Sequence, residues 1–474
     1  MKQKKLVRLL ICVLAIMLVI GMGVAALAAA SGDINNDGQI TVLDAQLIAE
    51  ANAGLRQLTD DQKLAAAALT VRELIQQILV WRNTNVYLAE NGSDDNAGTQ
   101  NAPYATLDKA LEQVADGGTI HVIGTVVVDE AFRFPDLDKS VTISGGSLDF
   151  SAYSTGKDMN LRDPMRFEGI ALLFRENQIV MANGNKLYMD GNVTMANPIK
   201  LYGGTGSYGA VVDGTDMTIL GGSYAFIYGG SYQQQINGDV KLVVGGNVNP
   251  NLDPSDHDLS NNVYGGSSGG NIDGTVYVTV TGNAKVCTVY GGGYGGSSIP
   301  DITITGGTVV NMDGGTAMGV VGGSKNAHQI GNTTVNFSGG NVEHVFGGCE
   351  RGPLTGDVSV NLTGGTISRR VYGGCYNECG FSFDTAYYVT GNITLTLAES
   401  ANITLQTSQL DRSIYARSRQ NVRSETEVST LVFADQAAYD AYSGKLGAQD
   451  STMKSIMGSI SAADHIVKQW EAAA

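Results

Sequence analysis

Oxygen-bearing side chains are crowded into a twelve-residue stretch near the N-terminus, "DINNDGQITVLD" at residues 33–44. Asp33, Asn35 and Asp37 stand at alternate positions, Gly38 follows them, and Asp44 ends the stretch. Carboxylate and amide oxygens spaced around a sharp turn are the ligands that Ca²⁺ prefers. Asp and Asn are also favoured at helix starts, where they cap backbone N–H groups. The stretch therefore predicts a calcium loop, with an acidic helix start as the alternative.

The loop follows the EF-hand pattern, with Asp in place of Glu at its last position. With the helical pattern after it, the segment 31–82 resembles a dockerin, the small calcium-dependent module by which secreted glycan-degrading proteins attach to cohesin-bearing scaffolds. The resemblance implies a cohesin-bearing scaffold as a partner. It also implies the following calcium ligands: Asp33, Asn35, Asp37, Gln39 through its backbone carbonyl, Thr41 directly or through water, and Asp44.

The module departs from the dockerin pattern in its second half. Dockerins have two calcium loops, and the second helix here matches the first, "LTVREL" against "ITVLDA". The loop before that helix, however, places Gln62, Leu64 and Ala66 at ligand positions, and Ala67 replaces the glycine. The side chains of Leu64 and Ala66 supply no ligand oxygen. We therefore expect one Ca²⁺ per chain.

The first 30 residues have the pattern of an export signal. Four basic residues precede an apolar run over 9–27, and "AAAS" follows it. Cleavage would leave a mature chain, and a retained segment is long enough to anchor the chain in a bilayer. The leader holds four of the 30 Lys and Arg residues of a chain with net charge −16, so the mature charge is near −20. This charge argues against nucleic acid and anionic lipid as partners. We expect an extracellular or cell-surface protein with no membrane contact beyond the signal segment.

Glycine is abundant, at 62 of 474 residues, and much of it belongs to a repeated motif of the form V-Y-G-G. The aromatic position of the motif, which we call the signature position, recurs at Tyr202, Tyr228, Tyr264, Tyr290, Val321, Phe346 and Tyr372. Four of the six intervals are 25 or 26 residues. A unit this short cannot bury its own apolar face, so neighbouring units must stack. The spacing predicts a mainly β fold, a right-handed parallel β-helix (β-solenoid).

The pattern divides the chain into five segments. These are a signal peptide at 1–30, the dockerin-like module at 31–82, the start of the β-helix with a capping helix at 83–142, the solenoid at 143–430 and a helical C-terminal cap at 431–474. The stretches "VYLAENGSDDNAGT", "APYATLDKALE" and "GGTIHVIGTV" resemble the first coils of extracellular right-handed β-helix proteins, which include pectate-lyase-like enzymes. The "VYGG" coils resemble glycine-rich repeats of bacterial adhesin-like surface proteins. For the C-terminal segment, "DQAAYDAYSGKL" and "AADHIVKQW" predict helices.

Polar residues recur eleven positions after the signature, each before an alternating strand such as "VKLVV" or "ITIT". They are Asp239, Thr275, Asp301, Asn332 and Asp357. Such a row would bind calcium between coils or form a carboxylate pair for lyase or hydrolase chemistry. Residues of these types also make local hydrogen bonds in turns, and we favour this third interpretation. Three arginines, Arg351, Arg369 and Arg370, lie near Glu343 and are interpreted as a solvated basic edge rather than as the base of a lyase. No Ser/His/Asp constellation is visible in the sequence.

Two further groups of residues have alternative interpretations. Cys349 and Cys375 occupy equivalent positions one coil apart, so stacking would bring them within disulfide range, with Cys379 as a competing partner. The sequence is equally consistent with a disulfide and with a stack of buried free thiols. The signature tyrosines would form either an exposed sugar-stacking row or an internal ladder. Their place between a strand valine and a glycine turn favours the ladder.

Two functional hypotheses follow. The first is a non-catalytic, adhesin-like surface protein whose repetitive face binds polysaccharide or a cell-surface scaffold, because nothing rare interrupts the coils where chemistry would sit. The second is a polysaccharide lyase or glycoside hydrolase of a cellulosome-like complex, as the dockerin resemblance implies. No pair of carboxylates is marked out by the sequence at the separation that glycosidases need.

Overall fold

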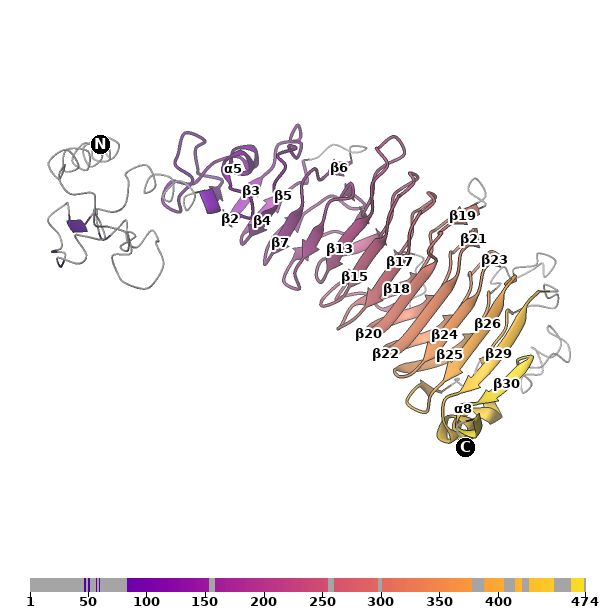
Figure 1. The fold of residues 1–474 in the computed structure, drawn as a ribbon. Helices are drawn as coiled ribbons and strands as arrows, with labels where there is room; N and C mark the ends of the chain where they lie inside the picture. The colour runs from indigo at the N-terminus through magenta and orange to yellow at the C-terminus, as the bar shows by residue number, and fades with distance from the viewer. Residues whose placement is uncertain are drawn as a thin grey trace, which may run out of the picture.

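The computed structural model describes residues 83–152, 158–254, 260–296, 301–376, 388–404, 414–419, 426–446 and 462–472, with a few single positions before residue 60. All six predicted calcium ligands lie outside the described residues, as do the signal segment and Cys379. From residue 83 onward the structure is an elongated stack of strands that runs from indigo to yellow in Figure 1.

The stack begins with a capped end. Strand β1 (Asn85–Ala89) pairs in parallel with β2 (Thr119–Ile123), and helix α5 (Leu107–Gln113) lies between them in sequence. The side chain of Thr106 caps the helix by accepting a hydrogen bond from the backbone N–H of Lys109. Leu107, Ala110 and Leu111 are buried, so the helix covers the apolar end of the stack (Figure 1). The predicted capping helix is confirmed.

Fourteen strands form one continuous parallel column, which we call the first column. After β1 and β2 it contains β4 (Val141–Ser144), β7 (Met165–Glu168), β10 (Leu187–Met189), β13 (Thr215–Ile219), β15 (Val240–Val244), β17 (Val276–Val280), the first part of β20 (Thr308–Val321), the first part of β22 (Thr333–Phe346), β24 (Val358–Leu362), β26 (Asn392–Leu397), β29 (Val428–Phe433) and β30 (His465–Lys468). Each coil of the chain therefore adds one strand to this column.

A second column contains the signature motif. Its strands are β6 (Met159–Asn160), β9 (Ile179–Met181), β12 (Ile199–Tyr202), β14 (Tyr224–Tyr228), β16 (Asn262–Tyr264), β18 (Lys285–Tyr290), the last parts of β20 and β22, β25 (Thr366–Tyr372), β27 (Asn402–Ile403) and β28 (Ile414–Tyr415). We call it the signature column. The pairings between its strands are also parallel.

Shorter strands complete the coils. The early coils have β3 (Thr125–Val127), β5 (Ser147–Asp149), β8 (Ala171–Leu173) and β11 (Thr194–Met195). The later coils have a third column of β19 (Asp301–Thr303), β21 (His328–Ile330) and β23 (Leu354–Thr355), preceded by single bridges at Val212, Ile236, Ile272 and Ile304. Long-range parallel pairing at intervals of one coil is consistent with the predicted β-solenoid.

The core follows from the alternation of side chains along each strand. In β15 and β17 every second residue is buried, and the intervening residues face solvent. Ile236, Ile272 and Ile304 enter the same core from the third column with no exposed surface. One apolar cluster therefore extends from the capped end to the last strands. Since each coil buries its apolar face against the next, the fold grows by addition.

The first glycine of each signature motif lies against the backbone of the next coil. A Cβ placed on Gly322 would lie 2.1 Å from the carbonyl oxygen of Gly347, and one on Gly347 would lie 2.0 Å from that of Gly373. The same contact recurs at Gly203, Gly229 and Gly291. No side chain fits at these distances. The motif therefore requires glycine because backbones of adjacent coils approach closely there.

The predicted strand at "ITIT" is confirmed as β19, which pairs in the third column, while Val276 of β17 pairs with Thr308 of β20. One sequence prediction of local structure is wrong. At the C-terminus, the sequence predicts a helix for "AADHIVKQW". Instead β30 pairs with β29, and only α8 (Gln469–Ala472) is helical after it. The other predicted helix is confirmed as α6 (Gln436–Tyr442), which a short 3₁₀ turn (Ser443–Lys445) extends.

Candidate functional site

The signature aromatics form a stacked ladder along the rod. Ring centroids lie 4.7 Å apart for Tyr202 and Tyr228, 4.6 Å for Tyr228 and Tyr264, and 4.9 Å for Tyr264 and Tyr290, with ring planes within 9° of parallel. All four side chains are at most 5% exposed. Burial raises the pKa of each hydroxyl well above its ordinary value. The predicted internal ladder is confirmed, and these rings are not an exposed sugar-stacking row.

The ladder lies outside the main core, in a second apolar cluster. Neighbouring residues of a strand point to opposite faces, so Val263 enters the main core while Tyr264 points outward. The loops after the motif lie over the ladder. Tyr232 packs edge-on against Tyr202 at 5.7 Å, and Tyr294 packs edge-on against Tyr264 at 5.9 Å. A rigid aromatic layer therefore supports these loops.

Three exposed tyrosines lie on the loops that cover the ladder. Tyr208 is fully exposed, and Tyr232 and Tyr294 are 38% and 40% exposed. Tyr232 and Tyr294 belong to the sequence pattern Y-G-G-x-Y, so a second aromatic follows the buried one at a fixed distance. The sequence-based prediction of a ladder concerned only the first tyrosine of this pattern. It therefore missed the exposed aromatics, although their signal is present in the repeat.

The loops between the signature column and the third column are uncharged over four successive coils. We define the tyrosine loop face as residues 203–212, 229–238, 265–272 and 291–296. They contain Gly, Ser, Thr, Tyr, Gln, Asn, Ala, Val and Ile only. The Ser207 hydroxyl donates to the Gln233 side chain at 2.8 Å, and the Gln234 amide donates to the Ser207 carbonyl. Aromatic rings beside amide and hydroxyl groups form a surface suited to polar, uncharged ligands.

The uncharged face ends where the aromatic ladder is interrupted. At Val321 no ring follows Tyr290, and the Tyr290 hydroxyl donates instead to the carboxylate of Glu350, which is buried. Arg351 Nε lies 3.3 Å from Glu350 Oε1, and Lys325 Nζ lies 5.6 Å from the centroid of the Tyr290 ring. A buried carboxylate is stable only with such partners. Glu350 is therefore neutralised by Arg351, and Lys325 adds a positive charge beside the Tyr290 ring.

The predicted basic edge is wrong, because its arginines are not simply solvated. Arg369 makes an ion pair with Glu343, and their side chains are only 16% and 23% exposed. The Arg370 guanidinium lies 5.3 Å from the centroid of the Tyr376 ring, which in turn stacks on Phe346 at 4.2 Å. Arg370 packs beside the ladder rings of Phe346 and Tyr376, and Arg369 pairs with a carboxylate of the preceding coil. Both arginines therefore link adjacent coils.

The polar residues after the signature make cross-coil hydrogen bonds, as expected for turn residues. Asp239 Oδ1 accepts from the backbone N–H of Thr275 at 2.9 Å, and Asn332 Oδ1 accepts from that of Asp357 at 2.9 Å. Asp357 Oδ1 accepts from that of Asn392 at 2.8 Å. Each of these side chains thus links one coil to the next by a hydrogen bond.

Three side chains of the third column form a row that the sequence did not reveal. Asp301 Oδ1 lies 3.0 Å from His328 Nδ1, and His328 Nε2 lies 2.8 Å from the Thr355 hydroxyl. The order carboxylate, imidazole, hydroxyl is that of an acyl-transfer triad. The Asp301 side chain, however, is 61% exposed, so water weakens its effect on the imidazole. We interpret the row as another cross-coil ladder.

The described cysteines are free thiols, and two of them replace serine in a repeated position. In several coils the residue three positions after the signature accepts a hydrogen bond from the equivalent N–H of the preceding coil. Ser267 Oγ accepts from Ser231 at 3.1 Å, Cys375 Sγ accepts from Cys349 at 3.3 Å, and Ser418 Oγ accepts from Cys375 at 3.1 Å. Cys349 and Cys375 form no disulfide. Burial raises the pKa of the Cys375 thiol well above its ordinary value.

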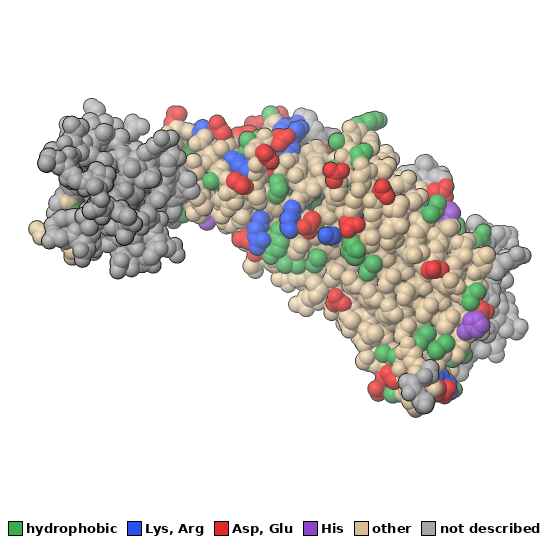
Figure 2. All heavy atoms as spheres, viewed as in Figure 1, with side chains coloured by type: hydrophobic (Ala, Val, Ile, Leu, Met, Phe, Trp, Pro, Cys, Tyr) green, Lys and Arg blue, Asp and Glu red, His purple; other side chains and the backbone are tan. Residues whose placement is uncertain are grey.

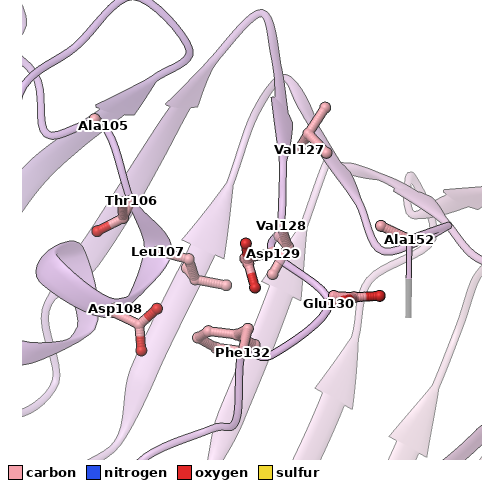
Figure 3. A pocket seen from close by; sticks show the side chains of 10 residues that line it. All are labelled: Ala105, Thr106, Leu107, Asp108, Val127, Val128, Asp129, Glu130, Phe132 and Ala152. Carbon is pink, nitrogen blue, oxygen red and sulfur yellow. The ribbon is translucent and has the colours of Figure 1, made fainter. Parts of the chain in front are cut away.

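A cavity of about 480 Å³ lies beside the capping helix (Figure 3). Its walls combine the apolar side chains of Leu107, Val128 and Phe132 with the carboxyl groups of Asp108 and Asp129. Burial raises the pKa of Asp108 above its ordinary value, and nearby carboxylates add to this shift. Asp129 accepts from the backbone N–H of Ala131 at 2.7 Å and so helps to shape its own turn. This cavity lies at the capped end, away from the tyrosine loop face.

Basic side chains gather over the N-terminal half of the rod on the face seen in Figure 2 and are sparse toward the C-terminal end. A groove of about 390 Å³ is lined by Lys186 and Lys241 and by Asp213, Asp216 and Asp239. Lys186 and Asp216 form an ion pair at 2.9 Å. Because its charges have both signs, the groove does not select a ligand of one charge.

Comparison with protein-family models, with curated protein sequences and with solved structures finds no match for this chain. Within the described part of the chain, no group of three or more His, Cys, Asp and Glu side chains could hold a metal ion. In the same residues no helix is long and apolar enough to cross a membrane. The exposed rings and uncharged loops make the tyrosine loop face the candidate site that the geometry favours.

Proposed function

We propose that this protein is an exported or cell-surface binding protein of adhesin-like type, whose β-solenoid displays the tyrosine loop face to polysaccharide or to a cell-surface scaffold. The single observation that supports this is the set of exposed tyrosines, Tyr208, Tyr232 and Tyr294, on three of the four successive uncharged loops. We take the coils to be right-handed, as crossovers between parallel strands almost always are.

The module at 31–82 completes the proposal. We propose that its loop binds one Ca²⁺ through Asp33, Asn35, Asp37, the Gln39 carbonyl, Thr41 and Asp44, and that the ordered module tethers the solenoid, with a cohesin-bearing scaffold as its expected partner. The signal segment at 1–30 supports an extracellular or cell-surface location. The acidic net charge argues against nucleic acid as a ligand.

Sedimentation with insoluble polysaccharides and with intact cell envelopes tests the binding function, with calcium present and then chelated. We expect the full chain to pellet with at least one surface and to release no product. The double variant Tyr232→Ala/Tyr294→Ala should stay in the supernatant. New reducing ends or unsaturated products would instead support the alternative, a polysaccharide lyase or glycoside hydrolase, and would contradict binding without catalysis.

Calorimetric titration with CaCl₂ tests the module. We expect one Ca²⁺ per chain, and no binding after Asp37→Ala, because that change removes a carboxylate from the middle of the loop. The matched control is Asp61→Ala in the second loop, which should leave the stoichiometry at one. Two sites of equal affinity would contradict our alignment of the second loop.

A further inference from the structure

We infer that the tyrosine loop face binds an uncharged polysaccharide whose chain runs along the long axis of the strand stack. This inference rests on the proposed binding function and adds the chemical class of the ligand and its direction. Three observations support it: the charge of the loops, the orientation of the exposed rings, and the way in which the loops are held together.

The charge of the face defines the ligand class. The four loops contain no Asp, Glu, Lys or Arg in a chain with 76 such residues. The nearest carboxylates along the chain, Asp213, Asp239 and Asp273, follow the ends of the loops. An acidic polysaccharide needs basic side chains to offset its charge, and a basic partner needs carboxylates. The face offers neither, whereas amide and hydroxyl groups both donate to and accept from sugar hydroxyls.

The orientation of the rings is the second observation, and it is compatible with a polysaccharide chain that runs along the rod. The ladder rings are nearly parallel and are stacked from coil to coil, so their normals point roughly along the rod. Tyr232 stands at 89° to the ring of Tyr202, and Tyr294 stands at 82° to the ring of Tyr264. A ring perpendicular to the ladder has a plane that contains the rod axis. The flat face of a sugar ring stacked on Tyr232 or Tyr294 therefore also lies along that axis.

Backbone hydrogen bonds fix the loops relative to one another. The Tyr232 N–H donates to the Thr205 carbonyl at 2.9 Å, and the Ser268 N–H donates to the Ser231 carbonyl at 2.9 Å. The Gly295 N–H donates to the Ser268 carbonyl at 3.0 Å. The loops therefore follow the strand spacing of about 4.8 Å, and four of them form a platform of about 15 Å along the rod. A platform that is ordered before binding loses little conformational entropy when a ligand arrives.

Affinity electrophoresis of the full chain in gels with soluble polysaccharides tests this inference. The uncharged set is mixed-linkage β-glucan, xyloglucan and galactomannan, and the acidic set is polygalacturonate and alginate. We expect retardation by at least one uncharged polymer, and little change in it between about 50 mM and about 500 mM salt, because salt screens only charged contacts. Tyr232→Ala and Tyr294→Ala should each weaken retardation about tenfold, the range typical of a lost aromatic contact.

Tyr277→Ala is the matched control. Tyr277 is 39% exposed, like Tyr232 and Tyr294, but lies on β17 in the first column. Its removal should leave retardation unchanged, and thermal unfolding of all variants should confirm that they fold. Affinity for oligosaccharides of the retained polymer should rise with length until the ligand is as long as the platform.

The outcomes separate this inference from the proposed function. Retardation by acidic polymers alone would overturn the ligand class. An equal loss of retardation in Tyr277→Ala would overturn the place of binding. Neither result would contradict the proposed binding function. An affinity that does not rise beyond a single sugar would overturn the direction along the rod. If the chain is retained by no polysaccharide and pellets with no cell envelope, both the inference and the proposed function are wrong.

Discussion

At the scale of single residues, Tyr264 and Tyr290, which stack on one another in the ladder, have hydroxyl groups with different surroundings. The Tyr290 hydroxyl donates to the buried Glu350 carboxylate. The Tyr264 hydroxyl is buried beside Asn262, a neutral side chain. The ladder therefore contains one hydroxyl that stabilises a charge and one that packs without such a partner.

We expect Tyr290→Phe to lower the free energy of unfolding by about 1–3 kcal/mol, because it removes a donor from a buried carboxylate. Tyr264→Phe is the matched control and should lower the free energy of unfolding by less than Tyr290→Phe does, since the Tyr264 hydroxyl faces the neutral Asn262 side chain and not a carboxylate to which it donates. Urea unfolding followed by far-UV circular dichroism measures both. Equal losses in the two variants would contradict the assigned role of Glu350.

The candidate site also shows at this scale what the sequence could predict. The recurrence of the V-Y-G-G motif at Tyr228, Tyr264 and Tyr290 predicted that these residues would stack, because equivalent positions in a solenoid lie one above another. It could not predict that Tyr232 and Tyr294 are exposed. Both tyrosines of a Y-G-G-x-Y pattern flank a glycine turn, and only the path of the loop decides which one faces solvent.

At the scale of elements, the glycines of the signature motif allow the backbones of adjacent coils to pack closely. The contact between Gly347 and the Gly373 carbonyl leaves no space for a methyl group, and the Val358 and Val360 side chains also lie within 2.6 Å of the place that a Cβ would occupy. A side chain there must displace a strand of the next coil rather than the end of a flexible side chain.

We expect Gly347→Ala to destabilise the chain by about 3 kcal/mol or more, at the upper end of the range for overpacking. Gly444→Ala is the matched control, because a Cβ at Gly444 meets nothing within 4 Å. Thermal unfolding by differential scanning calorimetry should show a clear drop in Tm for the first variant only. A Tm close to that of the parent chain in Gly347→Ala would contradict the close backbone approach.

The element scale also shows what the sequence could not predict. The stretches "ITIT" and "TVVNM" both alternate, so periodicity alone could not decide which one pairs with β17 in the 31-residue interval between Tyr290 and Val321. At the C-terminus, the short apolar run of His465–Lys468 is ambiguous between helix and strand. It is a strand because the edge of β29 accepts it, a long-range effect that local sequence does not contain.

At the scale of the whole molecule, buried tyrosines are spread over much of the rod. Burial raises the pKa of Tyr202, Tyr224, Tyr228, Tyr264 and Tyr290 above the ordinary value of 10.0. A raised pKa in the folded chain means that the folded state holds protons which the unfolded state has already released. The stability that these groups contribute is therefore complete below about pH 10 and is lost as the pH rises above it.

We expect the free energy of unfolding to be constant between about pH 8 and about pH 9.5 and to fall steeply above about pH 10, with several tyrosines contributing to the slope. Denaturant unfolding at a series of pH values measures the fall, and tyrosinate absorbance reports ionisation. The tyrosinate signal of the buried ladder should appear only together with unfolding. A single titration of all tyrosines near pH 10 in a chain that stays folded would contradict the buried ladder.

The glycine contacts between coils have a consequence for how such a chain changes over generations. Each coil presents to its neighbour the same set of positions that its neighbour presents to the next: glycine, the ladder ring, and the hydroxyl or thiol after it. Duplication or loss of one whole unit therefore restores every contact at the junction, whereas a shift by a few residues places a side chain against a backbone. Gain or loss of whole coils would therefore change the span of the displayed surface in discrete steps, whereas the longer intervals of 31 and 36 residues lengthen single coils without changing the number of stacked strands.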